Sequence, residues 1–316
     1  MDSNELQQLA AHTRSTREAG IALVIASGIL GLLLLIPLRP ERGASVAITN
    51  TAPTTIPDAF AQVPIEAQAA VVYDLATGET LYAKNADAQL PLASLTKLLT
   101  VYAAFAELSP DTPITIPASA TRLEGPRAFR EGQTFTLADL ARLTLTASLN
   151  DGAAAIATAT ALRENRSQNE MLAGAAAALG LSQTYAVNGN GLDVNAAVSG
   201  GYGSAHDLAV LAAALIEQAP AVAAATTQSS AEAASQSGVH FKVMNTDPMI
   251  DTIPRLLLSK TGYTDLAGGN LVLVFDAGIR HPIAVVVLGS SPKARFTDGT
   301  ALVAATLAHF AGVASL

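Results

Sequence analysis

The longest apolar stretch of the chain lies close to its N-terminus. Residues 19–38, AGIALVIASGILGLLLLIPL, carry no charged side chain. At about 1.5 Å per residue such a helix is about 30 Å long, which matches the hydrocarbon thickness of a bilayer. A cleaved signal peptide is the alternative, but its apolar region is about 7–15 residues long and its small-residue cleavage site follows closely. The best such site, at 59–61, lies far downstream, so we predict a transmembrane anchor at residues 19–38.

The next segment is polar and interrupted by proline. Residues 39–64 contain four prolines and many small polar residues, a composition typical of an extended linker. The predicted organisation is therefore a tail at 1–18, the anchor at 19–38, a flexible linker at 39–64 and one folded domain at 65–316.

Short runs of apolar and β-branched residues predict strands at both ends of the folded domain. The runs at 69–75 and 80–85 flank a Thr-Gly turn and predict a hairpin. Near the C-terminus, a strand is predicted at 255–264, and two further runs within 270–289 predict a second hairpin around a glycine-containing turn.

Helical periodicity dominates the region between these strands. Helices are predicted at 91–108, 137–149, 152–162, 170–181 and 204–218, with a last helix at 297–313. Residues 221–238 are low in complexity and predict a mobile loop or a frayed helix. The order of elements favours an α/β (α+β) fold: an antiparallel sheet built from both ends of the domain, flanked by helices, with an inserted helical subdomain.

Composition excludes several classes of function. The net charge of −8 argues against a nucleic-acid partner, since such a chain offers little to neutralise phosphates. The absence of cysteine excludes disulfides, thiolate catalysis and cysteine-bound metals. The five histidines are scattered without metal-ligand spacing, so we predict neither a metal site nor a cofactor.

A lysine in a leucine-rich run is the first candidate for chemistry. In PLASLTKLLT (91–100), Ser94 and Lys97 are three residues apart and share one face of a helix. Backbone N–H groups near a first-turn serine stabilise an oxyanion, and a lysine kept among leucines has a lowered pKa and can act as a general base. A helix-capping serine with a solvated lysine is the ordinary alternative, and a second Ser-x-x-Lys at 290–293 shows that the pattern also arises by chance.

Two further triplets favour the catalytic interpretation of Ser94 and Lys97 over the structural one. A Ser-x-Asn triplet at 148–150 ends a helical run, and Lys-Thr-Gly at 260–262 lies on an apolar strand. Glycine there leaves room for a substrate along the strand, and lysine offers a cation to a carboxylate. Each triplet alone has a structural alternative, a helix C-cap or a strand that ends in a turn. The three motifs in this order, each on the element that its chemistry needs, predict a serine nucleophile with a lysine base.

With these motifs the chain resembles the serine-type D-alanyl-D-alanine carboxypeptidases of peptidase family S11, the low-molecular-mass penicillin-binding proteins related to serine β-lactamases. The resemblance covers roughly residues 65–300 and implies a sheet with a helical subdomain and a site at their junction. Beyond the three triplets it includes segments at 71–100, 187–193, 245–250, 259–272 and 293–303.

The resemblance implies a catalytic role for four residues. Ser94 is the acylated nucleophile and Lys97 is its base. Ser148 passes a proton to the leaving amine, while Asn150 orients Lys97 and the substrate amide.

The resemblance also implies the groups that bind substrate. Lys260 and Thr261 bind the terminal carboxylate, and the backbone N–H groups of Ser94 and Tyr263, the residue after Gly262, form the oxyanion hole. We expect burial among leucines and repulsion from Lys260 to lower the pKa of Lys97. Lys260 must stay charged, so we expect water or hydrogen-bond partners to reach it.

The activity that the resemblance implies is removal of the terminal D-alanine from peptidoglycan stem peptides through an acyl-enzyme. β-Lactams would act as inhibitors that acylate the same serine. A D,D-endopeptidase, a β-lactamase and a penicillin or muropeptide sensor that is acylated without turnover are the alternatives. A β-lactamase needs fast deacylation, and the sequence identifies no glutamate positioned for it.

The orientation in the membrane follows from the substrate. Arg14 and Arg17 precede the apolar segment and Arg39 and Arg42 follow it, so the positive-inside rule gives no direction. Peptidoglycan lies outside the cell membrane, so we predict a single-pass protein with residues 1–18 in the cytoplasm and the catalytic domain outside it.

Two positions depart from the pattern usual in the family. Leu149 and Gly152 stand where a glycine and an alanine are usual, which predicts a narrower rim beside Ser148.

Overall fold

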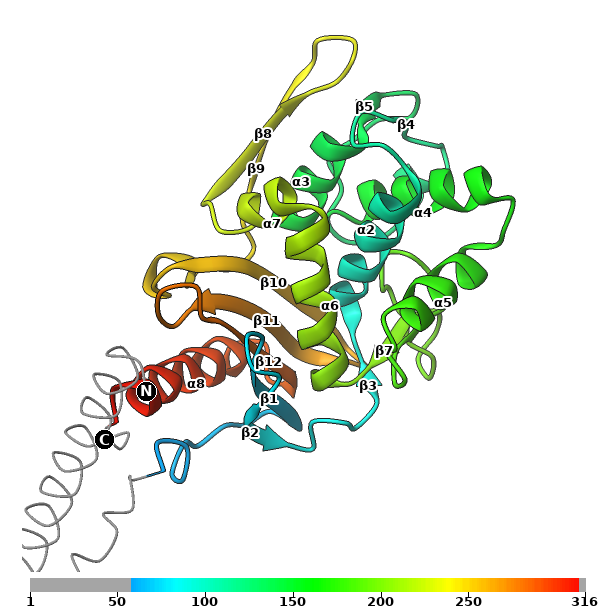
Figure 1. Cartoon of the computed structure of the whole chain (residues 1–316). Coiled ribbons are helices and arrows are strands. Elements are labelled where there is room, and N and C mark those ends of the chain that lie inside the picture. The colour runs from blue at the N-terminus through cyan, green and yellow to red at the C-terminus, as the bar shows by residue number, and fades with distance from the viewer. Residues whose placement is uncertain (1–57, 313–316) are drawn as a thin grey trace, which may run out of the picture. The chain divides into compact units, whose positions relative to one another are not determined.

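A computed structural model describes residues 58–312 (Figure 1). The predicted anchor, its tail and most of the predicted linker lie outside these residues. Within them, no helix combines the length and the apolar character needed to cross a membrane. The packed region includes the last residues of the predicted linker, because Ala59 and Phe60 are buried and the Phe60 ring lies 5.7 Å from that of Tyr82.

A five-stranded antiparallel sheet forms the centre of the fold, in the order β10-β11-β12-β1-β2. Ala69 of β1 pairs with Leu288 of β12, so the first strand lies beside the last one, as the predicted sheet requires. The strands are β1 (Ala69–Asp74), β2 (Thr80–Lys84), β10 (Leu256–Thr264), β11 (Gly268–Asp276) and β12 (Pro282–Ser290).

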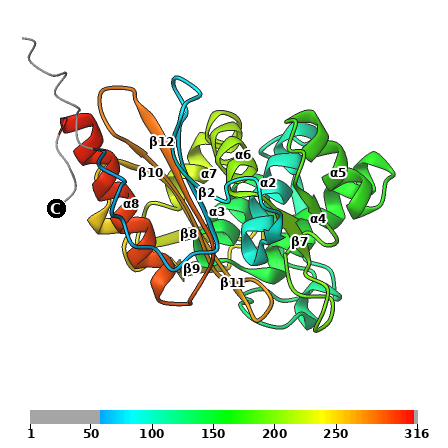
Figure 2. The same cartoon turned by 90° about the horizontal axis from the view of Figure 1, so that it is seen from below.

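Both faces of the sheet are buried, which explains why its strands are almost continuously apolar. Along β1, Ala69 and Val71 belong to one hydrophobic cluster, while Ala70 and Val72 belong to another on the opposite face. The last helix, α8 (Ala294–Ala311), covers one face, and the other helices lie across the opposite face (Figure 2).

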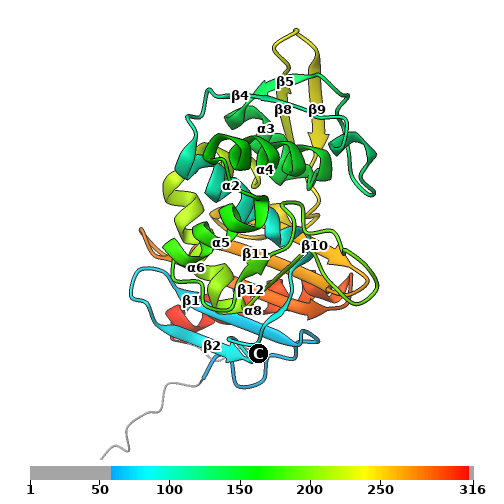
Figure 3. The ribbon, with the colours of Figure 1, turned by 90° about the vertical axis from the view of Figure 1, so that its right-hand side faces the viewer.

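The helical subdomain is inserted between β2 and β10, as the order of elements predicts (Figure 3). A short 3₁₀ turn, η1 (Ala93–Leu95), leads directly into its first helix, α2. The longer helices are α2 (Thr96–Glu107), α3 (Leu137–Ala147), α4 (Asn150–Glu164), α5 (Gln168–Ala178) and α6 (Ala205–Gln218). Short strands that the periodicity does not reveal join them: β3 (Leu90–Pro91), β4 (Pro113–Thr115), β5 (Thr134–Thr136), β6 (Tyr185–Ala186) and β7 (Gly201–Gly203).

The prediction of a mobile loop or frayed helix at 221–238 is wrong. This segment includes most of a short helix, α7 (Pro220–Ala225), followed by strand β8 (Ser230–Ala234). β8 pairs with β9 (His240–Met244), and the buried Ala231 and Val243 are opposite each other. Small residues hide this ribbon from sequence reasoning, because packing on the helical subdomain stabilises it rather than its own β-propensity.

Candidate active site

Ser94 lies in the η1 turn that precedes α2. The residue before it, Ala93, has a φ of 49°, a left-handed conformation that costs a non-glycine residue energy and is concentrated at functional sites. A hydrogen bond of 2.9 Å from Asn270 Nδ2 to the Pro91 carbonyl ties this turn to the central sheet. Ala93 and Leu95 are buried, whereas Ser94 is partly exposed. The turn therefore presents Ser94 at the junction of sheet and helices.

Lys97 is fully enclosed one turn further along α2. Its Nζ donates to Ser94 Oγ at 2.7 Å, to Asn150 Oδ1 at 2.8 Å and to the Asn190 carbonyl at 2.7 Å. Burial lowers the pKa of Lys97 well below its ordinary value, and the charge of Lys260 lowers it further, while Asp151 opposes both. The predicted direction and both predicted causes are confirmed. A lysine in this state can be neutral and accept the proton of Ser94.

Ser148 and Lys260 face each other across the other side of the site. Ser148 ends α3 in a left-handed conformation with a φ of 56°, and Lys260 Nζ donates to its Oγ at 2.8 Å and to the Thr261 carbonyl at 2.7 Å. Hydrogen-bond partners therefore reach Lys260, as expected. The sequence did not predict how deeply Lys260 is buried, with 1% of its surface exposed. Burial and the nearby Arg295 lower its pKa to about 7, against the opposing charge of Asp247.

Gly262 allows strand β10 to lie against the nucleophile turn. A Cβ atom at this position would stand 2.9 Å from the Leu92 carbonyl oxygen and 3.3 Å from the backbone nitrogen of Ser94. A side chain would therefore force the strand away from Ser94. The close approach is what an oxyanion hole shared between the turn and the strand requires, although the use of Tyr263 N–H in it remains a prediction.

A cleft of about 310 Å³ opens between these elements. Six of the eight predicted site residues line it, while Lys97 and Lys260 lie below its surface and bond to its walls. The lining residues are Ser94, Gly125, Pro126, Ser148, Asn150, Leu192, Thr246, Thr261, Gly262, Tyr263 and Arg295.

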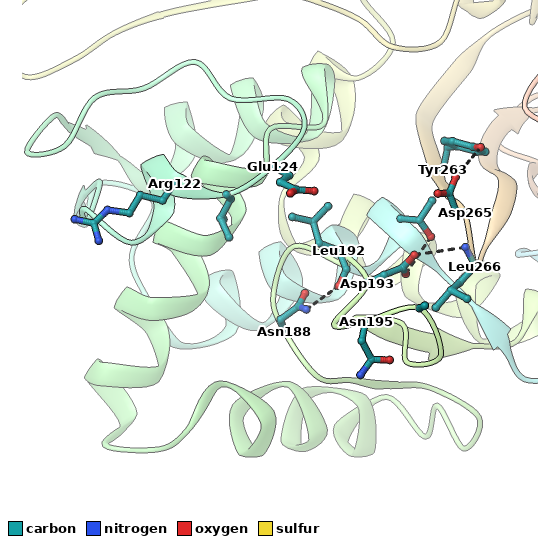
Figure 4. A pocket seen from close by; sticks show the side chains of 12 residues that line it. Arg122, Glu124, Asn188, Leu192, Asp193, Asn195, Tyr263, Asp265 and Leu266 are labelled. Atoms are coloured by element: carbon teal, nitrogen blue, oxygen red, sulfur yellow. Dashed lines mark hydrogen bonds between the residues drawn. The ribbon is translucent and has the colours of Figure 1, made fainter.

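A larger cavity of about 780 Å³ adjoins this cleft, and Leu192 and Tyr263 line both (Figure 4). Asp193 shapes its floor, since its carboxylate accepts hydrogen bonds from Thr264 Oγ1 at 3.1 Å and from the Leu266 backbone nitrogen at 3.4 Å. Leu192 and Tyr263 therefore lie where the two cavities meet.

The predicted narrowing of the rim by Leu149 and Gly152 is wrong. Both residues are buried, and neither lines the cleft. A Cβ atom on Gly152 would lie 2.1 Å from Thr144 Oγ1, so this glycine permits the close approach of α3 and α4. The second Ser-x-x-Lys begins at the last residue of β12 rather than in a loop, and there Ser290 donates its hydroxyl to buried Asp298 at 2.7 Å.

Arg295 and Asn190 are among the contributors to the site that sequence reasoning missed. Arg295, at the start of α8, lines the cleft and donates through Nη1 to the Gly262 carbonyl. Its only signal was its place in the 293–303 segment that resembles the family. Asn190 acts through its backbone carbonyl on Lys97, a role that carries no residue-type signal.

A serine paired with a buried lysine, in a cleft between an antiparallel sheet and a helical subdomain, defines the class of active-site serine acyl-transfer proteins. Comparison with known families agrees: the profile of Peptidase_S11, described as D-alanyl-D-alanine carboxypeptidase, matches residues 55–291. The chain belongs to this family.

The most informative relatives include both carboxypeptidases and endopeptidases. D-alanyl-D-alanine carboxypeptidase DacD of Escherichia coli (strain K12) is 31% identical over 249 residues, which cover 73% of this chain and 60% of that protein. The D-alanyl-D-alanine endopeptidase of Pseudomonas aeruginosa is 30% identical over 261 residues, which cover 80% of this chain and 82% of the relative. The chain thus spans less than two thirds of the length of DacD.

Solved structures show the same fold. Penicillin-Binding Protein D2 from Listeria monocytogenes, in its ampicillin bound form, superposes with a TM-score of 0.66 at 28% identity and covers 77% of this chain and 98% of its own. The Streptomyces K15 DD-transpeptidase reaches 0.68 at 24% identity, over 78% of this chain and 98% of its own, and supports the fold alone.

Proposed function

We propose that this protein is a serine D,D-carboxypeptidase that removes the terminal D-alanine of peptidoglycan stem peptides. The observation that carries the proposal is the 2.7 Å contact between Ser94 Oγ and Nζ of Lys97, a lysine without exposed surface and with a lowered pKa. This contact supplies an activated serine nucleophile without histidine. The family of the chain and the names of its relatives support the substrate class.

The reaction begins with attack of Ser94 Oγ on the carbonyl carbon between the two D-alanines. Neutral Lys97 takes the hydroxyl proton as the new C–O bond forms, and the backbone N–H groups of Ser94 and Tyr263 stabilise the oxyanion. The proton then passes from protonated Lys97 by way of the Ser148 hydroxyl to the leaving nitrogen, the C–N bond breaks and D-alanine departs. Water attacks the resulting ester and gives a proton to neutral Lys97, and the ester C–O bond breaks as that proton returns to Ser94 Oγ.

The strand β10 supplies recognition of the terminal carboxylate. Thr261 lines the cleft, and Lys260, in its protonated form, lies below the surface of the cleft and donates to Ser148 Oγ. The adjoining 780 Å³ cavity gives room for the part of the stem peptide that precedes the two D-alanines. Penicillins would enter as carboxylate-bearing acylating agents and leave a stable ester on Ser94.

Covalent labelling tests the assignment of the nucleophile. Ser94→Ala should abolish labelling by a fluorescent penicillin and release of D-alanine from a stem peptide. Ser290→Ala, in the second Ser-x-x-Lys, is the matched control and should keep both, since this hydroxyl serves Asp298. Labelling that survives in folded Ser94→Ala protein would refute the proposal. Rapid release of the label would favour a β-lactamase, and stable label without peptide turnover would favour a sensor.

A D,D-endopeptidase is the second candidate. The observation in its favour is the endopeptidase of Pseudomonas aeruginosa, which this chain covers to 82%. The same acyl-enzyme would form, with the amine of a cross-linked second peptide as leaving group. Incubation with a cross-linked dimer and with a monomer of the same stem peptide separates the two activities by their products.

The proposal also includes a location. Its substrate lies outside the cell membrane, so residues 19–38 would act as a single-pass anchor with residues 1–18 in the cytoplasm and the catalytic domain outside. Protease added to spheroplasts should digest the domain, while protease added to inverted vesicles should spare it. The reverse pattern would refute this orientation.

A further inference from the structure

Asp247 is a buried carboxylate beside the binding strand of the site. Its side chain leaves only 3% of the residue surface exposed, and its Oδ2 accepts a hydrogen bond of 2.6 Å from Ser259 Oγ. Its Oδ1 accepts a second hydrogen bond, of 2.8 Å, from the Met249 backbone nitrogen. Ser259 immediately precedes Lys260 on β10, so these contacts hold a negative charge against the strand next to the substrate-binding lysine.

A second contact fixes the same segment on the other side of Lys260. Thr246 and Thr261 share a hydrogen bond of 2.7 Å between their hydroxyl oxygens. Thr246 thus bonds to the residue after Lys260, and Asp247 bonds to the residue before Lys260. These two side-chain hydrogen bonds therefore hold the segment against neighbouring positions of β10.

Positive charges predominate around Lys260. Lys97 of α2 and Arg295 of α8 face the same site, and Arg295 lowers the pKa of Lys260 after burial has done so. Asp247 raises the pKa of both Lys260 and Arg295. Asp151 is the carboxylate that acts on Lys97.

Tyr263 also lines the cleft, and it acts on the guanidinium of Arg295. Among the charges of residues 58–312 that act on Lys260, Asp247 favours its protonated form. Removal of this carboxylate would leave burial and Arg295 unopposed.

We propose that Asp247 is a positioning residue for carboxylate recognition: held against β10 by Ser259, its charge keeps Lys260 cationic so that Lys260 can hold the terminal carboxylate of the substrate. The inference rests on the proposed carboxypeptidase function and deepens it. Asp247 touches neither substrate nor nucleophile in this scheme, and it acts on carboxylate binding through Lys260.

The sign of the effect follows from the role of Lys260. Carboxylate binding needs the protonated amine, so binding is present below the pKa of Lys260, about 7, and is lost as the pH rises through it. Loss of the Asp247 charge lowers that pKa further. The alkaline limb of the acylation profile should then move to lower pH by at most roughly one unit, because the charge of Asp247 acts on Lys260 less strongly than burial and Arg295 do.

Asp247→Asn is the direct test, because asparagine keeps the shape of the side chain. Its carbonyl oxygen can still accept from Met249 N, and its amide can donate to the Ser259 hydroxyl. Asp251→Asn is the matched control, because this aspartate is exposed and lies four residues along the same segment. The measurement is the second-order rate of acylation by a fluorescent penicillin across the pH range, after circular dichroism has shown that each variant is folded.

The expected result is a loss that depends on pH. With the alkaline limb moved down by up to roughly one unit, acylation of Asp247→Asn falls by up to about tenfold near pH 8 and by less than about twofold near pH 5.5. Asp251→Asn keeps the wild-type profile. In a Lys260→Arg background the cation does not deprotonate and the alkaline limb is absent, so Asp247→Asn should cause no further pH-dependent loss.

Three results would overturn the inference. One is a wild-type profile in Asp247→Asn, another is an equal loss at both pH values, and the third is a pH-dependent loss that persists beside Lys260→Arg. If Asp247→Asn does not fold, Asp247→Glu takes its place: the retained carboxylate must keep the alkaline limb within a few tenths of a unit. Wild-type protein that is neither labelled nor active would instead refute the proposed function itself.

Discussion

The exchange of each site lysine for arginine separates a base from a binding cation. Lys97→Arg keeps a positive charge but removes the base, because a guanidinium does not deprotonate in the working range. The loss of a general base costs about 10²–10⁴-fold in rate. Lys97 also has three hydrogen-bond acceptors within 2.8 Å and no exposed surface, so arginine has no room to move aside. Penicillin acylation should therefore fall by at least about 10²-fold.

Lys260→Arg should have a milder and different effect. Its guanidinium keeps the charge that binds a carboxylate, so the change should act mainly on KM. The pKa of Lys260, about 7, should define the alkaline limb in the wild type, and arginine should remove that limb. The acid limb, where Lys97 gains its proton, should remain, because activity falls as the pH drops through the lowered pKa of this lysine.

The assay is the pH dependence of penicillin acylation and of D-alanine release for the two variants, after thermal unfolding has shown that both are folded. Equal losses in the two variants, or normal acylation by Lys97→Arg, would mean that Lys97 is not the base. An alkaline limb that survives in Lys260→Arg would mean that another group titrates there.

Two glycine positions give further predictions. Gly262→Ala should push β10 away from the Leu92 carbonyl oxygen, because a Cβ atom at this position would stand 2.9 Å from it. Acylation should slow by up to about 10²-fold with the fold retained. An unchanged rate would contradict the close approach. Gly152→Ala should lower the free energy of unfolding by about 1–3 kcal/mol, because its Cβ would lie 2.1 Å from Thr144 Oγ1. Gly174→Ala is the control on an exposed part of α5, and it should raise the free energy of unfolding by about 0.5–1 kcal/mol. Urea unfolding measures the stability of both variants, and equal effects of the two substitutions would refute the packing argument.

Much of the fold could be predicted because the sheet has a strong local signal. β1, β11 and β12 are continuous apolar runs, and the two hairpins have turn residues where the structure turns. The strand β8 carries no such signal, since its stability comes from packing on α3 and pairing with β9. Gly152 was interpreted as part of a cleft rim because sequence shows which residue is present but not which helix lies against it.

In the candidate site, too, some features could be predicted from the sequence and others could not. The direction of the Lys97 pKa shift could be predicted because its leucine neighbours are adjacent in sequence. The burial of Lys260 and the contacts of Arg295 depend on elements more than 30 residues apart, such as the hydrogen bond from Arg295 to Gly262. Asn190 contributes only a carbonyl, which every residue has. Sequence reasoning can therefore predict effects of residues adjacent in the chain, but not effects of residues that only the fold brings together.

The pairing of β1 with β12 has a consequence for synthesis of the protein. Ala69 and Leu288, which are partners in the sheet, are separated by most of the folded chain. The Ser94–Lys97 pair is made early, but β10, which completes the cleft, and β12, which anchors β1, follow more than 150 residues later. Such long-range pairing folds slowly. The nascent chain would therefore carry its nucleophile without a cleft, and acylation would begin only when the last strands have joined the sheet.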